Sequence, residues 1–198
     1  QGLKAAFPNY EDKTLVELGL VISNEDKRYD RFRDRVMFPI QNARGAVIGF
    51  GGRILDKGEP KYLNSPETPI YSKSRTLYGL HLSKTGIRQG GFVVLVEGYF
   101  DFGQVYQAGF PVVASCGTAL TPQQAQQLRR FVGKVVLSYD PDAAGQGAAA
   151  RSSELLVAEG FDVNVATLPS GEDPDTFIQK KGTAAYGERL KQSRPYLE

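Results

Sequence analysis

The stretch Val93-Val94-Leu95-Val96-Glu97-Gly98-Tyr99-Phe100-Asp101 decides the fold. Its apolar, β-branched run ends in a carboxylate, a glycine and a second carboxylate, which is typical of a strand buried on both faces. Gly98 permits a sharp turn, and the residues after it are expected to be helical. In open α/β sheets, ligands bind at the carboxyl ends of the strands, so Glu97 is a candidate site residue. One acid at a strand end also fits a solvated loop, so the case depends on further acids at the same edge.

Strands and helices alternate from this stretch to the end of the chain. The predicted strands cover residues 92–96, 112–115, 135–139 and 163–168, and helices are predicted at 101–108, 121–131 and 146–159. This alternation predicts an α/β fold in which four parallel strands form a sheet flanked by helices, with right-handed crossovers. All strand-end loops then lie at one edge of the sheet.

Three of these loops carry paired acids, namely Glu97 with Asp101, Asp140 with Asp142, and Asp173 with Asp175. Carboxylates that meet at one edge repel one another unless cations bridge them, and two oxygen-bound metals are common in phosphoryl-transfer sites. Each acid alone has a simpler explanation. Asp101 could favour the positive end of a helix, Asp173 could be an N-cap, and Asp142 could be a loop acid. Those explanations would have to hold independently at every loop, which favours a shared site.

Composition narrows the class of protein. The 198 residues include one cysteine, Cys116, and one histidine, His81, so a zinc site built from these ligands is excluded within this chain. A metal would be held mainly by oxygen, which favours Mg²⁺ or Mn²⁺. There is no signal peptide, no run long enough for a membrane span and no internal disulfide, so we expect a cytoplasmic location. The sequence starts without Met, and we expect it to be a fragment.

The first half of the chain is basic. Residues 1–90 carry 15 Lys and Arg against 10 Asp and Glu, whereas residues 91–198 carry 9 against 12. A basic half beside an acidic half suits a metal-dependent protein that handles phosphates, although chance variation between two solvated surfaces would give the same pattern.

Local patterns in this half predict an α+β arrangement. A capping box, Thr14 to Glu17, predicts a short helix that starts near Thr14, and the polar residues 23–30 are expected to form a loop. Strands at 36–40 and 46–55 form a predicted hairpin, in which Gly51-Gly52 indicates a bulge or a close approach.

Two polar, basic segments follow the hairpin, at residues 61–68 and 71–79. Tyr62, Tyr71 and Tyr78 are interleaved with their Lys and Arg residues. Such a mixture suits a nucleic-acid or nucleotide surface, but a solvated loop with tyrosines packed beneath it would have the same composition.

Several motifs resemble known families. Glu97-Gly98 at one strand end and Asp140-x-Asp142 at another look like the Toprim domain of topoisomerases, primases, recombination proteins and nucleases. The whole set resembles the bacterial replicative, DnaG-type DNA primases: residues 31–40, Gly49-Phe-Gly-Gly-Arg53, residues 61–68, Leu77-Tyr-Gly79, Glu97–Asp101, the loop Ser115-Cys-Gly-Thr-Ala and Gly171-Glu-Asp-Pro-Asp175. One departure is Pro141, where the family usually has glycine between the paired aspartates. Proline removes a backbone N–H, but both carboxylates remain.

The resemblance implies a domain plan and an activity. Residues 1–89 would be a basic N-terminal subdomain of the polymerase core, residues 90–182 the Toprim domain, and residues 183–198 the start of a truncated helical subdomain. The implied enzyme is a DNA primase, a DNA-directed RNA polymerase that makes short RNA primers on single-stranded DNA by metal-dependent nucleotidyl transfer. The alternatives are another Toprim enzyme, such as a topoisomerase or nuclease, or a non-catalytic DNA-binding scaffold.

The resemblance also implies site residues, cofactors and partners. The implied metal ligands are Glu97, Asp140, Asp142 and Asp175, which would hold two or more Mg²⁺ or Mn²⁺ ions, with Asp101 and Asp173 as further catalytic acids. The implied nucleic-acid and nucleotide contacts are Arg31, Arg33, Arg53, Lys61, Asn64 and Lys73. The expected partners of a monomeric protein are the DNA template, the RNA primer and nucleoside triphosphates. A zinc domain before this region and a helicase-binding domain after it are expected to be absent from this chain.

Overall fold

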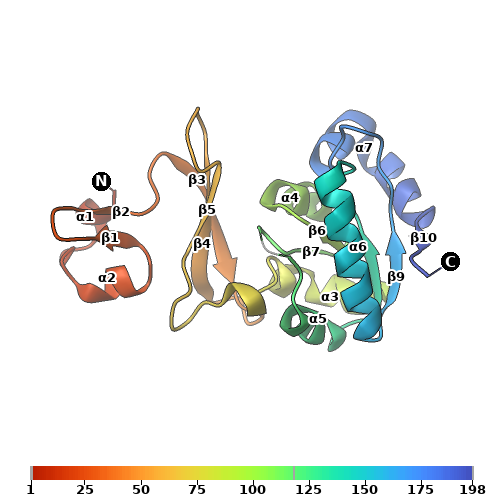
Figure 1. The fold of residues 1–198 in the computed structure, drawn as a ribbon, viewed down its shortest axis with the longest axis horizontal. Helices are drawn as coiled ribbons and strands as arrows, with labels where there is room; N and C mark the ends of the chain where they lie inside the picture. Colours follow the sequence, from red (N-terminus) through yellow and green to blue (C-terminus); the bar gives the residue numbers. More distant parts are fainter. Residues whose placement is uncertain (1, 118, 198) are drawn as a thin grey trace. The chain divides into compact units, whose positions relative to one another are not determined.

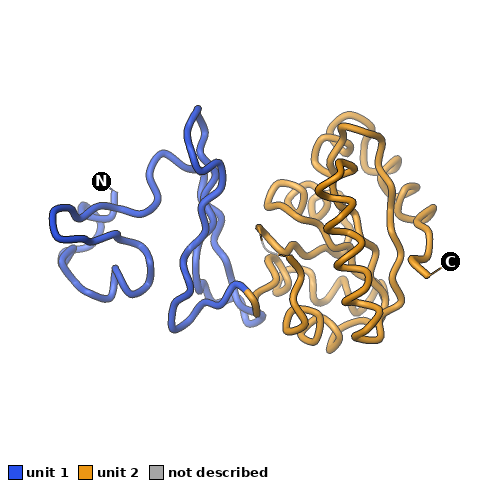
Figure 2. The backbone as a smooth tube through the Cα atoms, in the orientation of Figure 1, with its two compact units in different colours: residues 1–73 blue, residues 74–198 orange. Residues whose placement is uncertain are grey.

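The computed structural model describes residues 2–117 and 119–197 and divides the chain into two compact units, residues 1–73 and 74–198 (Figure 2). Thr118, which belongs to one of the family motifs, lies outside the described residues, as do Gln1 and Glu198 at the ends of the predicted domains. Within the described ranges, no helix is both long enough and apolar enough to cross a membrane.

Unit 1 begins with a small lobe around the buried side chains of Tyr10, Leu15 and Val21. Its elements are α1 (Gly2–Ala6), α2 (Lys13–Glu17), β1 (Val21–Ser23) and β2 (Arg28–Asp30). The predicted start near Thr14 is confirmed, because α2 begins at Lys13, but the predicted cap was wrong: the Asp12 side chain accepts the Thr14 N–H at 2.8 Å and caps the helix. The predicted loop at 23–30 was also wrong in part, because β1 and β2 pair as antiparallel strands.

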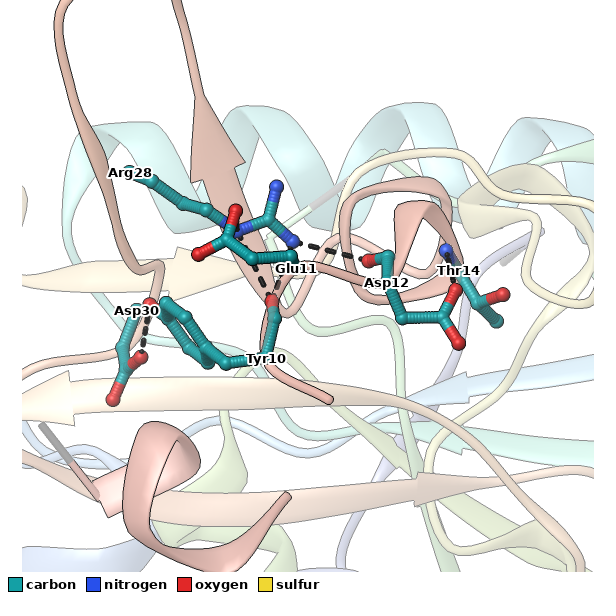
Figure 3. Close-up of polar contacts among 6 residues, drawn as sticks. All are labelled: Tyr10, Glu11, Asp12, Thr14, Arg28 and Asp30. Atoms are coloured by element: carbon teal, nitrogen blue, oxygen red, sulfur yellow. Dashed lines mark hydrogen bonds and ion pairs between the residues drawn. The ribbon is translucent and has the colours of Figure 1, made fainter. Parts of the chain in front are cut away.

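A buried carboxylate ties this lobe together (Figure 3). Asp30 is 5% exposed, and one of its oxygens accepts the Tyr10 hydroxyl at 2.7 Å while the other accepts the Leu3 N–H at 3.1 Å. The Arg28 guanidinium donates to the carbonyl oxygens of Tyr10, at 2.7 Å, and Asp12, at 3.0 Å. Both oxygens of the buried acid are thus satisfied, which is the usual condition for a structural polar group.

The predicted hairpin is present as β3 (Arg35–Gln41) and β4 (Val47–Ile54), and β5 (Tyr62–Asn64) adds a third antiparallel strand. A close approach does occur at Gly52 of the glycine pair, but side chains make it, not another backbone or a ligand as predicted. A Cβ there would lie 3.0 Å from carbon atoms of the Arg35 and Phe32 side chains. The register shift of the hairpin lies elsewhere, between Ile40 and Gln41.

Unit 2 is an α/β sandwich (Figure 1). The sheet has the order β10-β9-β8-β6-β7, and the pairs formed by β6, β7, β8 and β9 are all parallel, which confirms the predicted four-stranded arrangement. A fifth strand, β10, pairs antiparallel with β9 and was not predicted. The elements are α3 (Leu80–Gly90), β6 (Val93–Val96), α4 (Tyr99–Gln107), β7 (Val112–Ala114), α5 (Pro122–Arg129), β8 (Lys134–Leu137), α6 (Ala143–Ala158), β9 (Asp162–Val165), α7 (Pro174–Lys191) and β10 (Arg194–Pro195), preceded by the 3₁₀ turn η1 (Lys73–Arg75).

The connections place a topological switch point between β6 and β8. The chain leaves β6 through α4 to reach β7 on one side, and then returns through α5 to β8 on the other side of β6. All four residues of β6 are buried, as expected for the centre of a parallel sheet. Helix α6 covers one face of this sheet in Figure 1. The gap where the strand order reverses is the usual ligand position in such folds.

Candidate metal and nucleotidyl-transfer site

Two of the predicted acids follow the strands on either side of the switch point. Glu97 comes directly after β6, and Asp140 lies three residues beyond the end of β8. The two strands pair in parallel, with Leu95 opposite Leu137, so the segments that follow β6 and β8 leave the sheet at the same edge. The Asp140 N–H donates to the Glu97 carboxylate at 3.5 Å, which joins the two strand ends.

Three acids converge most closely at this edge. One carboxylate oxygen from each of Asp101, Asp140 and Asp173 lies within 4.8 Å of the others. Asp101 comes from the first turn of α4, and Asp173 is the N-cap of α7. Three segments far apart in the sequence therefore supply one acid cluster, defined here as Asp101, Asp140 and Asp173.

Backbone and side-chain donors orient several of these acids. Asp101 accepts the Asp175 N–H at 3.2 Å. Asp173 accepts both the N–H of Thr176, at 2.7 Å, and its hydroxyl, at 2.6 Å. The Gln179 amide donates to Asp175 at 2.6 Å. The acids at the start of α7 are thus held by groups on the same helix.

Burial and the neighbouring acids raise the pKa values of Asp101, Asp140 and Glu97. Burial is the main cause that raises the pKa of Asp101 to about 7, and the charges of Asp173 and Asp140 add to it, while the hydrogen bond from the Asp175 N–H acts in the opposite direction. The pKa of Asp140 is raised by burial and then by Asp173 and Asp142. The pKa of Glu97 is raised by burial and then by Asp140. A divalent cation would relieve this repulsion, and an all-oxygen donor set suits Mg²⁺ or Mn²⁺. The residues therefore fit a divalent metal site.

The other predicted acids lie at the border of the cluster. Asp142 is exposed and caps α6, where its carboxylate accepts the Gly145 N–H at 2.7 Å. Asp175 is half-buried beside Asp101. Of the four predicted ligands, Glu97, Asp140, Asp142 and Asp175, only Asp140 belongs to the acid cluster. Asp142 and Asp173 combine a capping role with their place at the site, so the two explanations open to the sequence coexist.

The predicted nucleic-acid residues lie in unit 1, on and around its three-stranded sheet. Arg31 donates to the Asn64 carbonyl oxygen at 3.0 Å, which joins two of them. The guanidinium of Arg33 lies 4.6 Å from the Tyr29 ring centre, and that of Arg53 lies 5.9 Å from the Tyr62 ring centre. The side chain of Lys61 is exposed, and Lys73 uses its backbone N–H to bind Glu67 at 2.7 Å. Stacked arginines beside exposed tyrosine suit contacts to phosphates and bases.

One positioning residue was missed from the sequence. Gly145 lies in the first turn of α6, and a Cβ at this position would collide with the Asp140 carbonyl oxygen. The missing side chain lets the start of α6 approach the chain at Asp140. A glycine three residues after the Asp-x-Asp pair was the available signal, but its importance depends on a backbone approach that the sequence does not display.

Family models and a curated relative match most of this chain. A family model of the N-terminal domain of the DNA primase catalytic core matches residues 3–84, and a Toprim-like model matches residues 94–178. The DNA primase of Clostridium acetobutylicum is 49% identical over 179 residues, which cover 89% of this chain and 30% of that protein. The chain thus spans about a third of the length of this curated relative.

Solved structures of primases have the same fold as this chain. The zinc-binding and RNA polymerase domains of the Aquifex aeolicus primase match with a TM-score of 0.87 and 39% identity, over 92% of this chain and 46% of that one. A DnaG primase catalytic domain bound to single-stranded DNA matches with a TM-score of 0.86 and 42% identity, over 96% of this chain and 61% of that one. The chain belongs to the DnaG-type DNA primases and corresponds to part of their catalytic core, including the Toprim domain.

Proposed function

We propose that this chain carries the nucleotidyl-transfer site of a DNA primase, a DNA-directed RNA polymerase that makes RNA primers on single-stranded DNA for replication. The observation that carries the proposal is the convergence of Asp101, Asp140 and Asp173 at the switch point of the sheet. Buried acids that repel one another without a cation destabilise the fold, so a bound metal is the simplest reason for the arrangement.

The reaction joins two nucleotides. The 3′-oxygen of the primer forms a bond to the α-phosphorus of a nucleoside triphosphate, the bond to pyrophosphate breaks, and the hydroxyl proton leaves. Two or more Mg²⁺ or Mn²⁺ ions held by Glu97, Asp140, Asp142 and Asp175, beside Asp101 and Asp173, would activate the hydroxyl and neutralise the phosphates. Glu97 serves either as a ligand or as the base that takes the proton.

The basic unit supplies the contacts to nucleic acid and nucleotide. Arg31, Arg33, Arg53, Lys61, Asn64 and Lys73 would bind the template or the triphosphate. The related DnaG primase catalytic domain bound to single-stranded DNA supports DNA binding by this chain. Arginine suits bidentate phosphate contacts, and lysine suits a point-charge contact.

The domain plan completes the proposal. Residues 1–89 form the basic subdomain, 90–182 the Toprim domain and 183–198 the start of a helical subdomain. In the longer protein, a zinc domain precedes this region and a helicase-binding domain follows it. The Aquifex aeolicus structure, which includes zinc-binding and RNA polymerase domains, supports a separate place for zinc.

A direct test measures Mn²⁺ binding by paramagnetic broadening of NMR signals. We expect broadening of residues around Asp101, Asp140 and Asp173, and its loss in Asp140→Asn. Glu154→Gln, an exposed acid on α6 with no described contact, is the matched control and should bind as the wild type does. If Mn²⁺ leaves these signals sharp, a non-catalytic DNA-binding scaffold becomes the better explanation.

A further inference from the structure

A pocket of about 410 Å³ lies beside Glu97 and is separate in its lining from the acid cluster. Its walls include Glu97, Ser115, Tyr139, Arg151, Ser152 and Leu155, together with small apolar residues of the loop before α5. Its volume falls within the ~300–1,000 Å³ typical of ligand pockets. Glu97 connects the pocket to the acid cluster. Its side chain lines the pocket, and its carboxylate accepts the N–H of Asp140, a member of the cluster.

The lining of the pocket includes one cation, the solvent-exposed Arg151. A Cβ at Gly147 would lie 3.3 Å from the Arg151 Nη1, so the guanidinium lies back along α6 toward the start of that helix. Within the described ranges, Arg151 makes no hydrogen bond or ion pair. An arginine that lines a pocket and has no anionic neighbour bound to it is available for a phosphate.

The rest of the lining is apolar with a few hydroxyl groups. Tyr139 and Ser152 are buried, and their hydroxyl oxygens lie 3.2 Å apart. Leu120 and Leu155 contribute apolar surface. Apolar walls with a few polar groups and one cation match the parts of a nucleotide, namely a flat base, a sugar with hydroxyls and a phosphate.

We propose that this pocket holds the 3′-terminal ribonucleotide of the growing RNA, with its phosphodiester on Arg151 and its sugar beside Glu97. The inference rests on the proposed function, because it assigns the pocket to the strand whose 3′-hydroxyl reacts at the acid cluster. Because Glu97 lines the pocket and also contacts the acid cluster, a sugar held against Glu97 presents its 3′-oxygen toward Asp140.

Charge separates this occupant from the incoming nucleotide. A nucleotide within RNA carries one phosphodiester charge, which a single arginine balances. A nucleoside triphosphate carries several negative charges, which the single Arg151 guanidinium in this lining does not balance. The pocket therefore fits the primer end better than the incoming triphosphate.

Binding of the ribodinucleotide ApA, whose 3′-terminal nucleotide carries one phosphodiester charge, to this chain in EDTA tests the inference without metal. We expect NMR shift changes at the Arg151 side chain and at Ser152. Arg151→Gln should raise the Kd about tenfold, the size expected for a lost charge-assisted hydrogen bond. Arg189→Gln, an exposed arginine near the other end of α7, is the control and should leave the Kd unchanged. Equal Kd values for the wild type and Arg151→Gln, or shifts confined to residues 1–73, would overturn the proposal.

Primer extension by the full-length primase gives the second measurement. Arg151→Gln should raise the KM for an annealed RNA primer several-fold and leave the KM for the nucleoside triphosphate unchanged. A rise only in the KM for the triphosphate would instead assign the pocket to the incoming nucleotide and contradict the inference. Failure of the proposed function would appear separately, as an absence of Mn²⁺ binding at the acid cluster of the wild-type chain. The nucleotide-binding measurement in EDTA does not depend on metal, so the two failures can be distinguished.

Discussion

Among the residues that the structure describes, each unit buries one carboxylate side chain, and the two are held in opposite ways. Asp30 in unit 1 is 5% exposed and has donors on both oxygens, from Tyr10 and Leu3. Asp101 in unit 2 is 9% exposed, accepts one N–H and faces Asp140 and Asp173. A buried acid surrounded by donors stabilises a fold, whereas a buried acid that faces other acids is arranged for a ligand that brings positive charge.

The largest effect is expected at the acid cluster. Asp140→Asn should lower primer synthesis by full-length primase roughly 100-fold or more, since it removes a carboxylate that would hold the metal ions needed to neutralise the reacting phosphates. Circular dichroism should show an unchanged fold. A folded Asp140→Asn enzyme that retains primer synthesis would mean that acids which face acids need not mark the reaction site.

The structural role of the buried carboxylate in unit 1 is tested at Asp30. Asp30→Ala should lower the local stability of unit 1 by about 2–3 kcal/mol, because it leaves the Tyr10 hydroxyl and the Leu3 N–H without their acceptor. Hydrogen exchange at the amides of β1 and β2 measures this loss. Asp26→Ala, an exposed acid in the same lobe, should leave exchange unchanged. Mn²⁺ binding should be unchanged in both variants, and a loss in Asp30→Ala would blur the distinction between the two acids.

Removal of the Asp101 charge should stabilise the fold, whereas removal of Asp30 should destabilise it. In EDTA at pH 8, Asp101→Asn should raise the free energy of unfolding by about 2 kcal/mol, because it removes a buried charge that neighbours repel. The pKa of Asp101 is raised to about 7 in the folded protein, so folding takes up a proton and the wild type gains stability as the pH falls from about 7 toward the ordinary Asp value. The advantage of the variant should therefore shrink between pH 8 and pH 5, as followed by urea unfolding. A variant less stable than the wild type at pH 8 would mean that Asp101 is structural, like Asp30.

The smallest effect is expected at the exposed basic residues. Lys61→Gln should weaken binding of single-stranded DNA and reduce the slope of log K against log salt by about one. Fluorescence anisotropy at several salt concentrations measures the slope. Lys57→Gln, also exposed in unit 1, is the matched control. Equal slopes for the wild type and Lys61→Gln would identify Lys61 as an ordinary surface residue.

The sequence predicted the parallel sheet well because its signals are local and repeated. The apolar run at residues 93–96 and the helix predicted at 121–131 depend on neighbours in the sequence, and both are present in the structure, as β6 and α5. The strand β10 was not predicted, because a two-residue strand has no periodicity and depends on pairing with β9. Pairing also turned part of the expected loop at 23–30 into strands.

The site was predicted in part for the same reason. That the acids share one edge follows from parallel strands alone. Which acids lie closest depends on α4 and α7, whose first turns bring Asp101 and Asp173 to Asp140. The cap at Asp12 and the close approach at Gly145 likewise depend on distances that residue types do not encode.

Pro141 stands between two acids of the site, and the Gln146 side chain donates to its carbonyl oxygen at 2.9 Å. Its ring fixes one backbone angle, and the cap formed by Asp142 fixes the next turn. Much of the conformational entropy of this loop is therefore already lost on folding rather than on ligand binding. The consequence is thermodynamic: little ordering of this loop remains to oppose the binding of a cation or a nucleotide at the proposed site.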